Sequence, residues 1–199
     1  MHWKAQGVEA GLGAGAFLTI DLGAVAANWT LLNALSQEKV ETAGVLKADG
    51  YGLGALPVAK ALLAAGCRRF FVALPDEGVA LREGLQDIGA ANVPIHVLNG
   101  LFPGAEQLYQ HYDLIPTLNH LGEVAMWREA AQQAEKALPA VLQFDSGMTR
   151  LGVPKSEQEQ LFDWQERLQG IALTHVRSDL DSAYEVDSTQ TEGQAAHFV

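Results

Sequence analysis

The chain has 199 residues, of which 48% are hydrophobic and 19% are charged, so it can fold around a sizeable core and is not intrinsically disordered. Its formal net charge of −11 argues against long-range attraction to nucleic acid or an anionic membrane, while a local basic pocket for a phosphate stays compatible with it. A single cysteine, Cys67, excludes an internal disulfide, and no apolar stretch is long enough to span a membrane, so we expect a cytoplasmic protein with neither nucleic acid nor membrane as a partner.

Strand-like apolar runs alternate with amphipathic helices almost without interruption, beginning with a strand at 16–20. Asp21 then caps a helix, and one face of this helix collects Leu22, Val25, Trp29 and Leu32. Further strands are expected at 42–47, 69–74, 93–98, 113–118, 139–144 and 171–176. Helices are expected at 56–65, 75–85, from about 103, at 119–137 and at 156–170, and a polar loop leads from the last strand into residues 189–199.

Several residues mark where these helices begin and end. Gly66 is expected to end the helix at 56–65, and Gly84 to close the next one. Asn119 is expected to cap the helix at 119–137. Ser156 and Glu159 have the spacing of a capping box, which predicts the start of the last helix before residue 170.

Alternating strands and helices predict a parallel sheet, either an open doubly wound sheet or a (β/α)₈ barrel. Polar residues follow the strands at their carboxyl ends, where both folds place their active sites; they are Lys47, His96, Asn99, Asp145 and His175. The glycines after Lys47 lack the spacing of a dinucleotide-binding loop, which weakens the open-sheet interpretation. A barrel is therefore favoured.

Lys47 lies at the end of an apolar run and is followed at once by a glycine-rich turn. Desolvation of an ammonium favours loss of its proton, and a neutral lysine forms Schiff bases with carbonyl compounds, including pyridoxal phosphate. The glycines permit close approach of a bulky ligand, and Tyr51 supplies an aromatic wall with a hydroxyl group. The alternative is a lysine at a strand end that reaches solvent before a turn.

A second stretch of the same kind carries Arg150, whose guanidinium could hold a carboxylate or a phenolate by two parallel hydrogen bonds. The alternative is a local salt bridge between Asp145 and Arg150 that fixes the turn. His175, at the end of the last strand, could act as a proton shuttle or an orienting group, or could be a structural residue. The acidic residues after it match no calcium loop and are interpreted as a solvated loop: Asp179, Asp181, Glu185 and Asp187.

Several motifs resemble those of the alanine racemase family. Residues 45–54, VLKADGYGLG, look like the family's pyridoxal-phosphate lysine motif, and residues 144–152, FDSGMTRLG, are similar to its second signature. Further matches occur in the right order, at residues 19–22 with 28–29, at residues 75–82, and at residues 174–175. The lysine and arginine motifs together make the resemblance specific.

The resemblance implies a barrel that binds pyridoxal phosphate at the carboxyl ends of its strands and interconverts L- and D-alanine, an isomerase activity that supplies D-alanine for the cell wall. Lys47 would hold the cofactor as a Schiff base and move the α-proton. Tyr51 would contact the cofactor phosphate. Arg150 would bond the phenolic oxygen of the cofactor and help to place the substrate carboxylate, and His175 would lie by the ring. No metal is implied, and full-length family members form homodimers.

The resemblance divides the chain into an N-terminal extension, residues 1–16, and a partial cofactor-binding barrel domain, residues 17–199. By count from the strand at 42–47, about six of eight barrel strands are present, and the family's C-terminal β-domain, to which the strand at 16–20 would belong, is absent. Gln143 stands where some members carry a carboxylated lysine that braces the arginine. We therefore expect little or no racemase activity, and doubtful dimer formation, from this chain alone.

Two alternative functions stay open. One is a non-catalytic barrel that only carries pyridoxal phosphate. The other is a lyase that forms a Schiff base on Lys47 directly with a carbonyl substrate and uses no cofactor.

Overall fold

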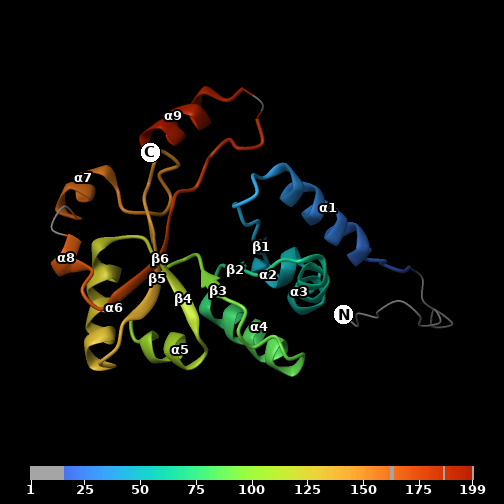
Figure 1. Cartoon of the computed structure of the whole chain (residues 1–199), viewed down its shortest axis with the longest axis horizontal. Helices are drawn as coiled ribbons and strands as arrows, with labels where there is room; N and C mark the ends of the chain where they lie inside the picture. The colour runs from blue at the N-terminus through green and yellow to red at the C-terminus, as the bar shows by residue number, and fades with distance from the viewer. Residues whose placement is uncertain (1–15, 162–163, 186, 199) are drawn as a thin grey trace.

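The computed structural model describes residues 16–161, 164–185 and 187–198 (Figure 1). In these residues the strands form one parallel sheet in the order of the chain, β1-β2-β3-β4-β5-β6. The strands are β1 Gly44–Val45, β2 Phe70–Val72, β3 Ile95–Val97, β4 Leu114–Leu118, β5 Leu138–Gln143 and β6 Ile171–Arg177. A doubly wound sheet reverses its strand order at a switch point, whereas this order has no reversal, as in a (β/α)₈ barrel. The fold is therefore an α/β barrel-type domain that is partial, as predicted.

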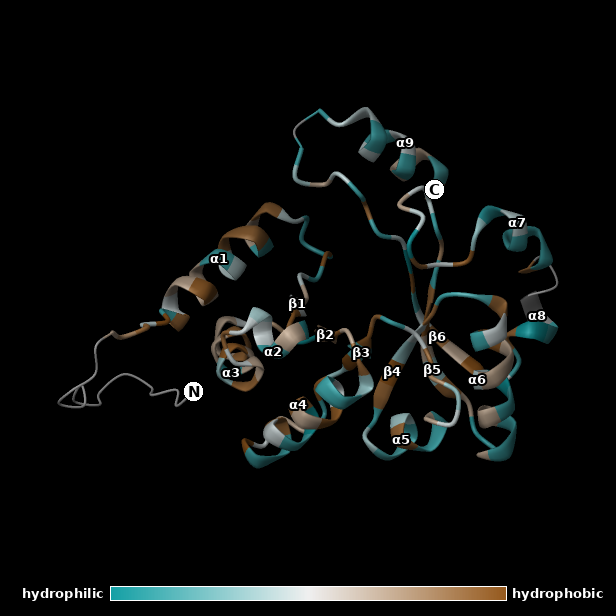
Figure 2. Cartoon of the chain, turned by 180° about the vertical axis from the view of Figure 1, so that it is seen from behind, coloured by the Kyte–Doolittle hydropathy of each residue, from teal (hydrophilic) through white to brown (hydrophobic). Residues whose placement is uncertain are grey.

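The helices alternate with the strands along the chain; most of them flank the sheet, whereas the first and the last lie apart from it (Figure 1). They are α1 Leu22–Leu35, α2 Lys47–Tyr51, α3 Ala55–Ala65, α4 Pro75–Asp87, α5 Glu106–His111, α6 Leu121–Gln133, α7 Lys155–Gln158, α8 Trp164–Arg167 and α9 Thr189–Phe198, with a 3₁₀ turn at Glu159–Leu161. Figure 2 shows β4 as strongly hydrophobic and α9 as mostly hydrophilic. The largest buried side chains of the core include Trp127, Tyr109 and Phe70, and Cys67 is buried with them, as expected.

The predicted strand at 16–20 is wrong. These residues have no strand conformation, and Phe17 and Leu18 are exposed. A strand needs a neighbour for its backbone hydrogen bonds, and no described strand pairs with this segment. The cap at Asp21 is confirmed, since its carboxylate accepts the N–H of Ala24 at 3.0 Å. Because α1 packs against α3 and lies apart from the sheet (Figure 1), Leu32 is exposed.

Two helix boundaries differ from the prediction for reasons of packing. Gly84 does not end α4, which continues to Asp87; a Cβ at Gly84 would lie 2.7 Å from Leu56, so this glycine allows α3 and α4 to approach. Helix α6 is capped by His120, not by Asn119. The amide of Asn119 instead donates to two backbone carbonyls of the sheet, those of Leu98 and Thr117.

The single helix predicted at 156–170 is wrong. Helix α7 begins at Lys155 after Pro154, without a side-chain cap, and gives way to the 3₁₀ turn and then to α8. A 3₁₀ turn is wound more tightly than an α-helix, and this one brings Leu161 fully into the core. Burial of a leucine therefore overrides the capping-box spacing of Ser156.

The predicted extension at residues 1–16 lies outside the described residues except for Ala16, so the division at residue 17 stays a prediction. Within the described part of the chain, none of the helices combines the length and the apolar character that a membrane crossing requires.

Candidate functional site

Lys47 lies two residues beyond the last residue of β1 and begins a turn, residues 47–54, that we call the lysine turn. Leu46 before it is buried, whereas Lys47 is only partly buried, so its amine emerges at the carboxyl end of β1. The Nζ atom lies 5.9 Å from the centre of the Tyr51 ring, within reach of a cation–π contact. Tyr51 is 62% exposed, which leaves its ring and its hydroxyl group accessible to a ligand.

The backbone of the lysine turn has positive φ angles over five successive residues, from Ala48 to Gly52, whose φ is 79°. The φ angles are 52° at Ala48, 52° at Asp49, 62° at Gly50 and 56° at Tyr51. Three of these residues carry a Cβ, and each costs roughly 1–2 kcal/mol in this conformation. The carboxylate of Asp49 supports the turn by accepting the N–H of Ala55 at 2.7 Å. Such strain persists only where neighbouring groups hold it in place.

Glu77, in the first turn of α4, holds the lysine turn from the neighbouring unit. Its Oε1 accepts the N–H of Ala48, the residue after Lys47, at 2.6 Å. Its Oε2 accepts the N–H groups of Ala73 at 2.7 Å and Leu74 at 3.1 Å. One carboxylate thus joins the peptide after Lys47 to the junction of β2 and α4.

Arg150 lies on a second turn, residues 145–152, that we call the arginine turn. The side chain of Asp145 fixes the backbone of this turn, because its Oδ1 accepts the N–H groups of Gly147 and Thr149, both at 2.9 Å. The alternative salt bridge between Asp145 and Arg150 is wrong. Arg150 instead directs its NH2 group to the carboxylate of Asp179, at 3.5 Å.

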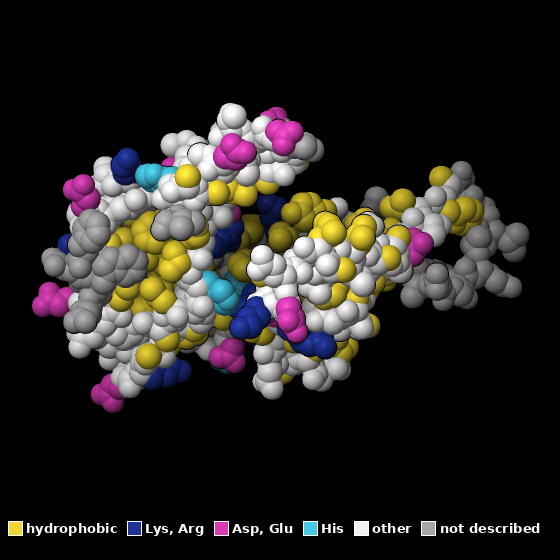
Figure 3. Space-filling view, turned by 45° about the horizontal axis from the view of Figure 1, so that its top comes forward, with side chains coloured by type: hydrophobic (Ala, Val, Ile, Leu, Met, Phe, Trp, Pro, Cys, Tyr) yellow, Lys and Arg dark blue, Asp and Glu magenta, His cyan; other side chains and the backbone are white. Residues whose placement is uncertain are grey.

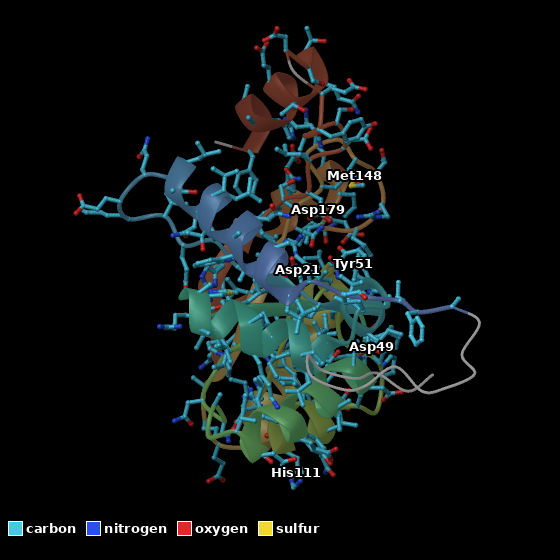
Figure 4. The ribbon with its side chains drawn as sticks, turned by 90° about the vertical axis from the view of Figure 1, so that its right-hand side faces the viewer. Asp21, Asp49, Tyr51, His111, Met148 and Asp179 are labelled. Carbon is cyan, nitrogen blue, oxygen red and sulfur yellow. The ribbon has the colours of Figure 1, made fainter. Side chains whose placement is uncertain are left out.

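Asp179, which is labelled in Figure 4, binds three side chains through one carboxylate. Besides Arg150, it accepts hydrogen bonds from Arg177 and, at 3.3 Å, from the amide of Gln143. Its side chain is 21% exposed. The interpretation of Asp179 as part of a solvated acidic loop is therefore wrong: its charge is paired with two arginines.

His175 belongs to a set of side chains on the side of the sheet away from the helices, which we call the concave-face network: Glu41, Arg69, Phe71, His96, His175 and Arg177. The NH1 group of Arg69 lies 3.2 Å from Nε2 of His96 and 3.3 Å from Nδ1 of His175. Glu41 pairs with Arg69 at 2.9 Å. Figure 3 shows basic and histidine side chains gathered in the hollow between the two halves of the molecule.

Both histidines of this network are held neutral. Burial lowers the pKa of His96 to about 3, and the positive charges of Arg69 and Arg177 lower it further, as does His175 whenever it is protonated. Burial also lowers the pKa of His175, and Arg69 lowers it further. Because Arg69 donates to Nε2 of His96, the neutral ring carries its proton on Nδ1.

The structure brings the predicted residues together in two groups. Lys47 and Tyr51 contact each other. Arg150 and Arg177 both pair with Asp179. Arg177 lies over the ring of Phe71, which stacks on His96 at 4.6 Å. Arg69 contacts both His96 and His175, so a chain of contacts connects Arg150 to His175. Among the described residues no direct contact joins the two groups. They meet through the strands, where the N–H of Leu46 donates to the carbonyl of Phe71 at 2.7 Å.

Sequence reasoning missed four residues that organise these groups: Arg69, Glu77, Arg177 and Asp179. Two of them had a local signal. Arg177 stands two residues after His175 on the same strand, so the alternation of side chains places both on one face. Arg69 stands two residues before Phe71 in the same way. Glu77 reaches Ala48, and Asp179 reaches Arg150, across 29 residues in each case, and no local pattern signalled these two contacts.

The residues present fit a cofactor that carries an aldehyde and anionic groups. Lys47 offers an amine at a strand end, and Arg150, which is 58% exposed, keeps guanidinium N–H groups free for an anion. A cavity of about 400 Å³ adjoins the other side of the lysine turn, and its lining holds three carboxylates, of Asp49, Asp76 and Glu77. These charges would repel a phosphate, so the concave side is the compatible one.

A model of the family "Alanine racemase, N-terminal domain" matches residues 20–199. The alanine racemase of Acidiphilium cryptum is 47% identical over 181 residues, which are 91% of this chain and 48% of that protein. The catabolic alanine racemase of Agrobacterium fabrum is 43% identical over 196 residues, 98% of this chain and 49% of that protein. The chain thus spans about half the length of these relatives.

Solved structures agree with this match. The alanine racemase of Bartonella henselae with covalently bound pyridoxal phosphate has a TM-score of 0.82 and 33% identity, and the match covers 90% of this chain and 51% of that one. The alanine racemase of Bacillus anthracis with bound L-Ala-P has a TM-score of 0.78 and 27% identity, and the match covers 90% and 45%.

Proposed function

Because this chain belongs to the alanine racemase N-terminal domain family, we propose that it holds pyridoxal phosphate on Lys47 and contributes to the interconversion of L- and D-alanine. The observation that carries the proposal is the position of Lys47 at the carboxyl end of β1, in a strained turn with its amine accessible and Tyr51 beside it. Strain of this kind is found where a functional group must be held in one position.

Each site residue has a role that its surroundings support. When bound, pyridoxal phosphate supplies a conjugated ring that takes up the charge left by the departing α-proton. Lys47 binds the cofactor through Nζ and, once released, carries the proton at that atom. Tyr51 offers its hydroxyl to the phosphate, and Arg150 offers parallel N–H groups to a phenolic oxygen or a carboxylate. His175, whose pKa is lowered and whose ring is oriented by Arg69, would lie beside the cofactor ring.

The proposed substrate is alanine, and the relative that binds L-Ala-P supports this choice. We further propose that the whole protein supplies D-alanine for the cell wall, in the cytoplasm, as a homodimer. These last proposals follow from family membership alone.

The test is trapping of the cofactor on its lysine. The purified chain is incubated with pyridoxal phosphate, reduced with borohydride, digested and mapped. We expect the label on Lys47, its loss in Lys47→Ala, and no change in Lys60→Ala, which alters an exposed lysine of α3. A label spread evenly over the lysines would contradict the proposal.

Two further measurements separate the alternatives. Exchange of the α-proton of alanine into deuterated water, by cofactor-loaded protein, distinguishes a racemase site from a barrel that only carries pyridoxal phosphate. Trapping of a carbonyl compound on Lys47 without any cofactor would favour a lyase.

A further inference from the structure

We propose that Glu77 is a positioning residue for Lys47: its carboxylate holds the peptide that follows Lys47 and thereby sets the direction in which the amine meets an aldehyde. The inference rests on the function proposed above and adds to it a residue from the next βα unit of the sheet.

The contact is short and charge-assisted. Oε1 of Glu77 lies 2.6 Å from the backbone N of Ala48, across 29 residues of sequence. Hydrogen bonds to an ionised acceptor are stronger than those between neutral groups. Glu77 also stands in the first turn of α4, where the helix dipole favours a negative charge. The carboxylate is therefore a firm anchor for the turn.

The turn needs such an anchor because its backbone is strained. Ala48 is the first of the left-handed residues, with a φ of 52° and a ψ of 47°. Two backbone hydrogen bonds lie within the turn: Gly50 N donates to Leu46 O at 2.9 Å, and Gly54 N donates to Asp49 O at 2.8 Å. The N–H of Ala48 donates outside the turn, to Glu77. Without the bond to Glu77, Ala48 would relax toward an ordinary conformation, and the side chain of Lys47 would leave with it.

A simpler role must be separated from this one. Through Oε2, Glu77 also accepts the N–H groups of Ala73 and Leu74, so it caps the start of α4. A residue that only caps α4 would affect the stability of the fold and would leave the rate of reaction per folded molecule unchanged.

Two substitutions divide the roles. Glu77→Asp keeps a carboxylate at the helix start but shortens its reach by one methylene group, so that the bond to Ala48 is lost. Glu77→Gln keeps the length but offers one acceptor oxygen in place of two. Glu83→Gln is the matched control, because it removes an exposed carboxylate from the same helix.

The measurement is the rate of borohydride-trappable attachment of pyridoxal phosphate to Lys47 in the full chain, at increasing cofactor concentration, with the folded fraction measured in parallel. For both Glu77 variants we expect the rate at saturation, per folded molecule, to fall by about tenfold, the effect of losing one charge-assisted hydrogen bond. The half-saturating concentration should be unchanged, since the Glu77 carboxylate accepts backbone N–H groups and would repel a phosphate. Glu83→Gln should behave as the wild type.

Wild-type rates in folded Glu77→Asp and Glu77→Gln would overturn the role of Glu77 and leave the proposed function standing. A rise in the half-saturating concentration with an unchanged maximal rate would also overturn it. Absence of any trapped cofactor on Lys47 in the wild-type chain would overturn the proposed function, and the inference with it.

Discussion

The lysine turn and the arginine turn look alike in the sequence and are held in different ways in the structure. Each follows a strand and contains glycines. Backbone N–H groups that donate short hydrogen bonds to the carboxylates of Glu77 and Asp49 hold the lysine turn. The backbone of the arginine turn is held by Asp145, but its functional side chain, Arg150, depends on an exposed ion pair with Asp179 at 3.5 Å.

The difference shows how a site can combine a fixed group and an adjustable one. A backbone bonded at 2.6–2.7 Å to carboxylates fixes the starting point of the lysine side chain. Exposed ion pairs contribute only about 0–1 kcal/mol, so Arg150 can leave Asp179 for an anionic ligand at little cost. The proposed covalent attachment point is therefore rigid, and the proposed anion-binding group can change its partner.

The largest expected effect comes from adding one carbon atom to the arginine turn. In Gly152→Ala, the new Cβ would lie 2.6 Å from backbone atoms of Phe144 and Asp145, at a φ of 107°. We expect a loss of about 3 kcal/mol or more in the free energy of unfolding, because neither the clash nor the φ angle can be relieved locally. Urea unfolding measures it.

The matched substitution in the lysine turn is Gly52→Ala. Gly52 has a φ of 79°, and an added Cβ would meet nothing within 4 Å, so only the conformational cost of about 1 kcal/mol applies. Equal losses in the two variants would show that the arginine turn is not the more tightly packed backbone.

Acid should weaken the concave-face network that lies between the two turns. The pKa of His96 falls from 6.5 to about 3 on folding, so below pH 6.5 the unfolded chain binds a proton that the folded chain does not. The contribution of His96 to stability is therefore complete above pH 6.5 and is lost as the pH falls toward 3, by up to about 1.4 kcal/mol per pH unit. Urea unfolding at several pH values measures the slope.

The control for this prediction is His96→Leu, which removes the titrating ring at similar volume. Its stability should depend less steeply on pH than that of the wild type in the same interval. Identical slopes would show that His96 does not carry the acid sensitivity.

A small effect is also expected for Asp179→Asn. Loss of this charge leaves Arg150 and Arg177 facing each other, and since the group is partly exposed we expect a cost of about 1 kcal/mol. The difference from the wild type should shrink at about 1 M salt, where charges are screened within a few ångströms. Asp181→Asn, in the same loop, serves as the control; a salt-independent loss would contradict the ion-pair account.

Much of the fold could be predicted because its signals are local. The cap at Asp21 and the left-handed Gly66 at the end of α3 are formed by residues within one helical turn. Each barrel strand was found from its apolar run; β1 to β4 are shorter than predicted, β5 is shifted by one residue, and β6 extends one residue further. The segment 16–20 was misjudged for the same reason: an apolar run shows that a strand is possible, and a paired neighbour decides whether it forms.

The sequence by itself determined the alternation of strands and helices, the place of Lys47 at a strand end and the glycines that follow it, because hydrophobic periodicity and capping act over a few residues. Only the tertiary structure decided which groups hold the site. Glu77 reaches Ala48 across 29 residues, and Arg150 pairs with Asp179 in preference to the nearer Asp145. Contacts of this kind depend on which strands lie side by side, and no local pattern encodes them.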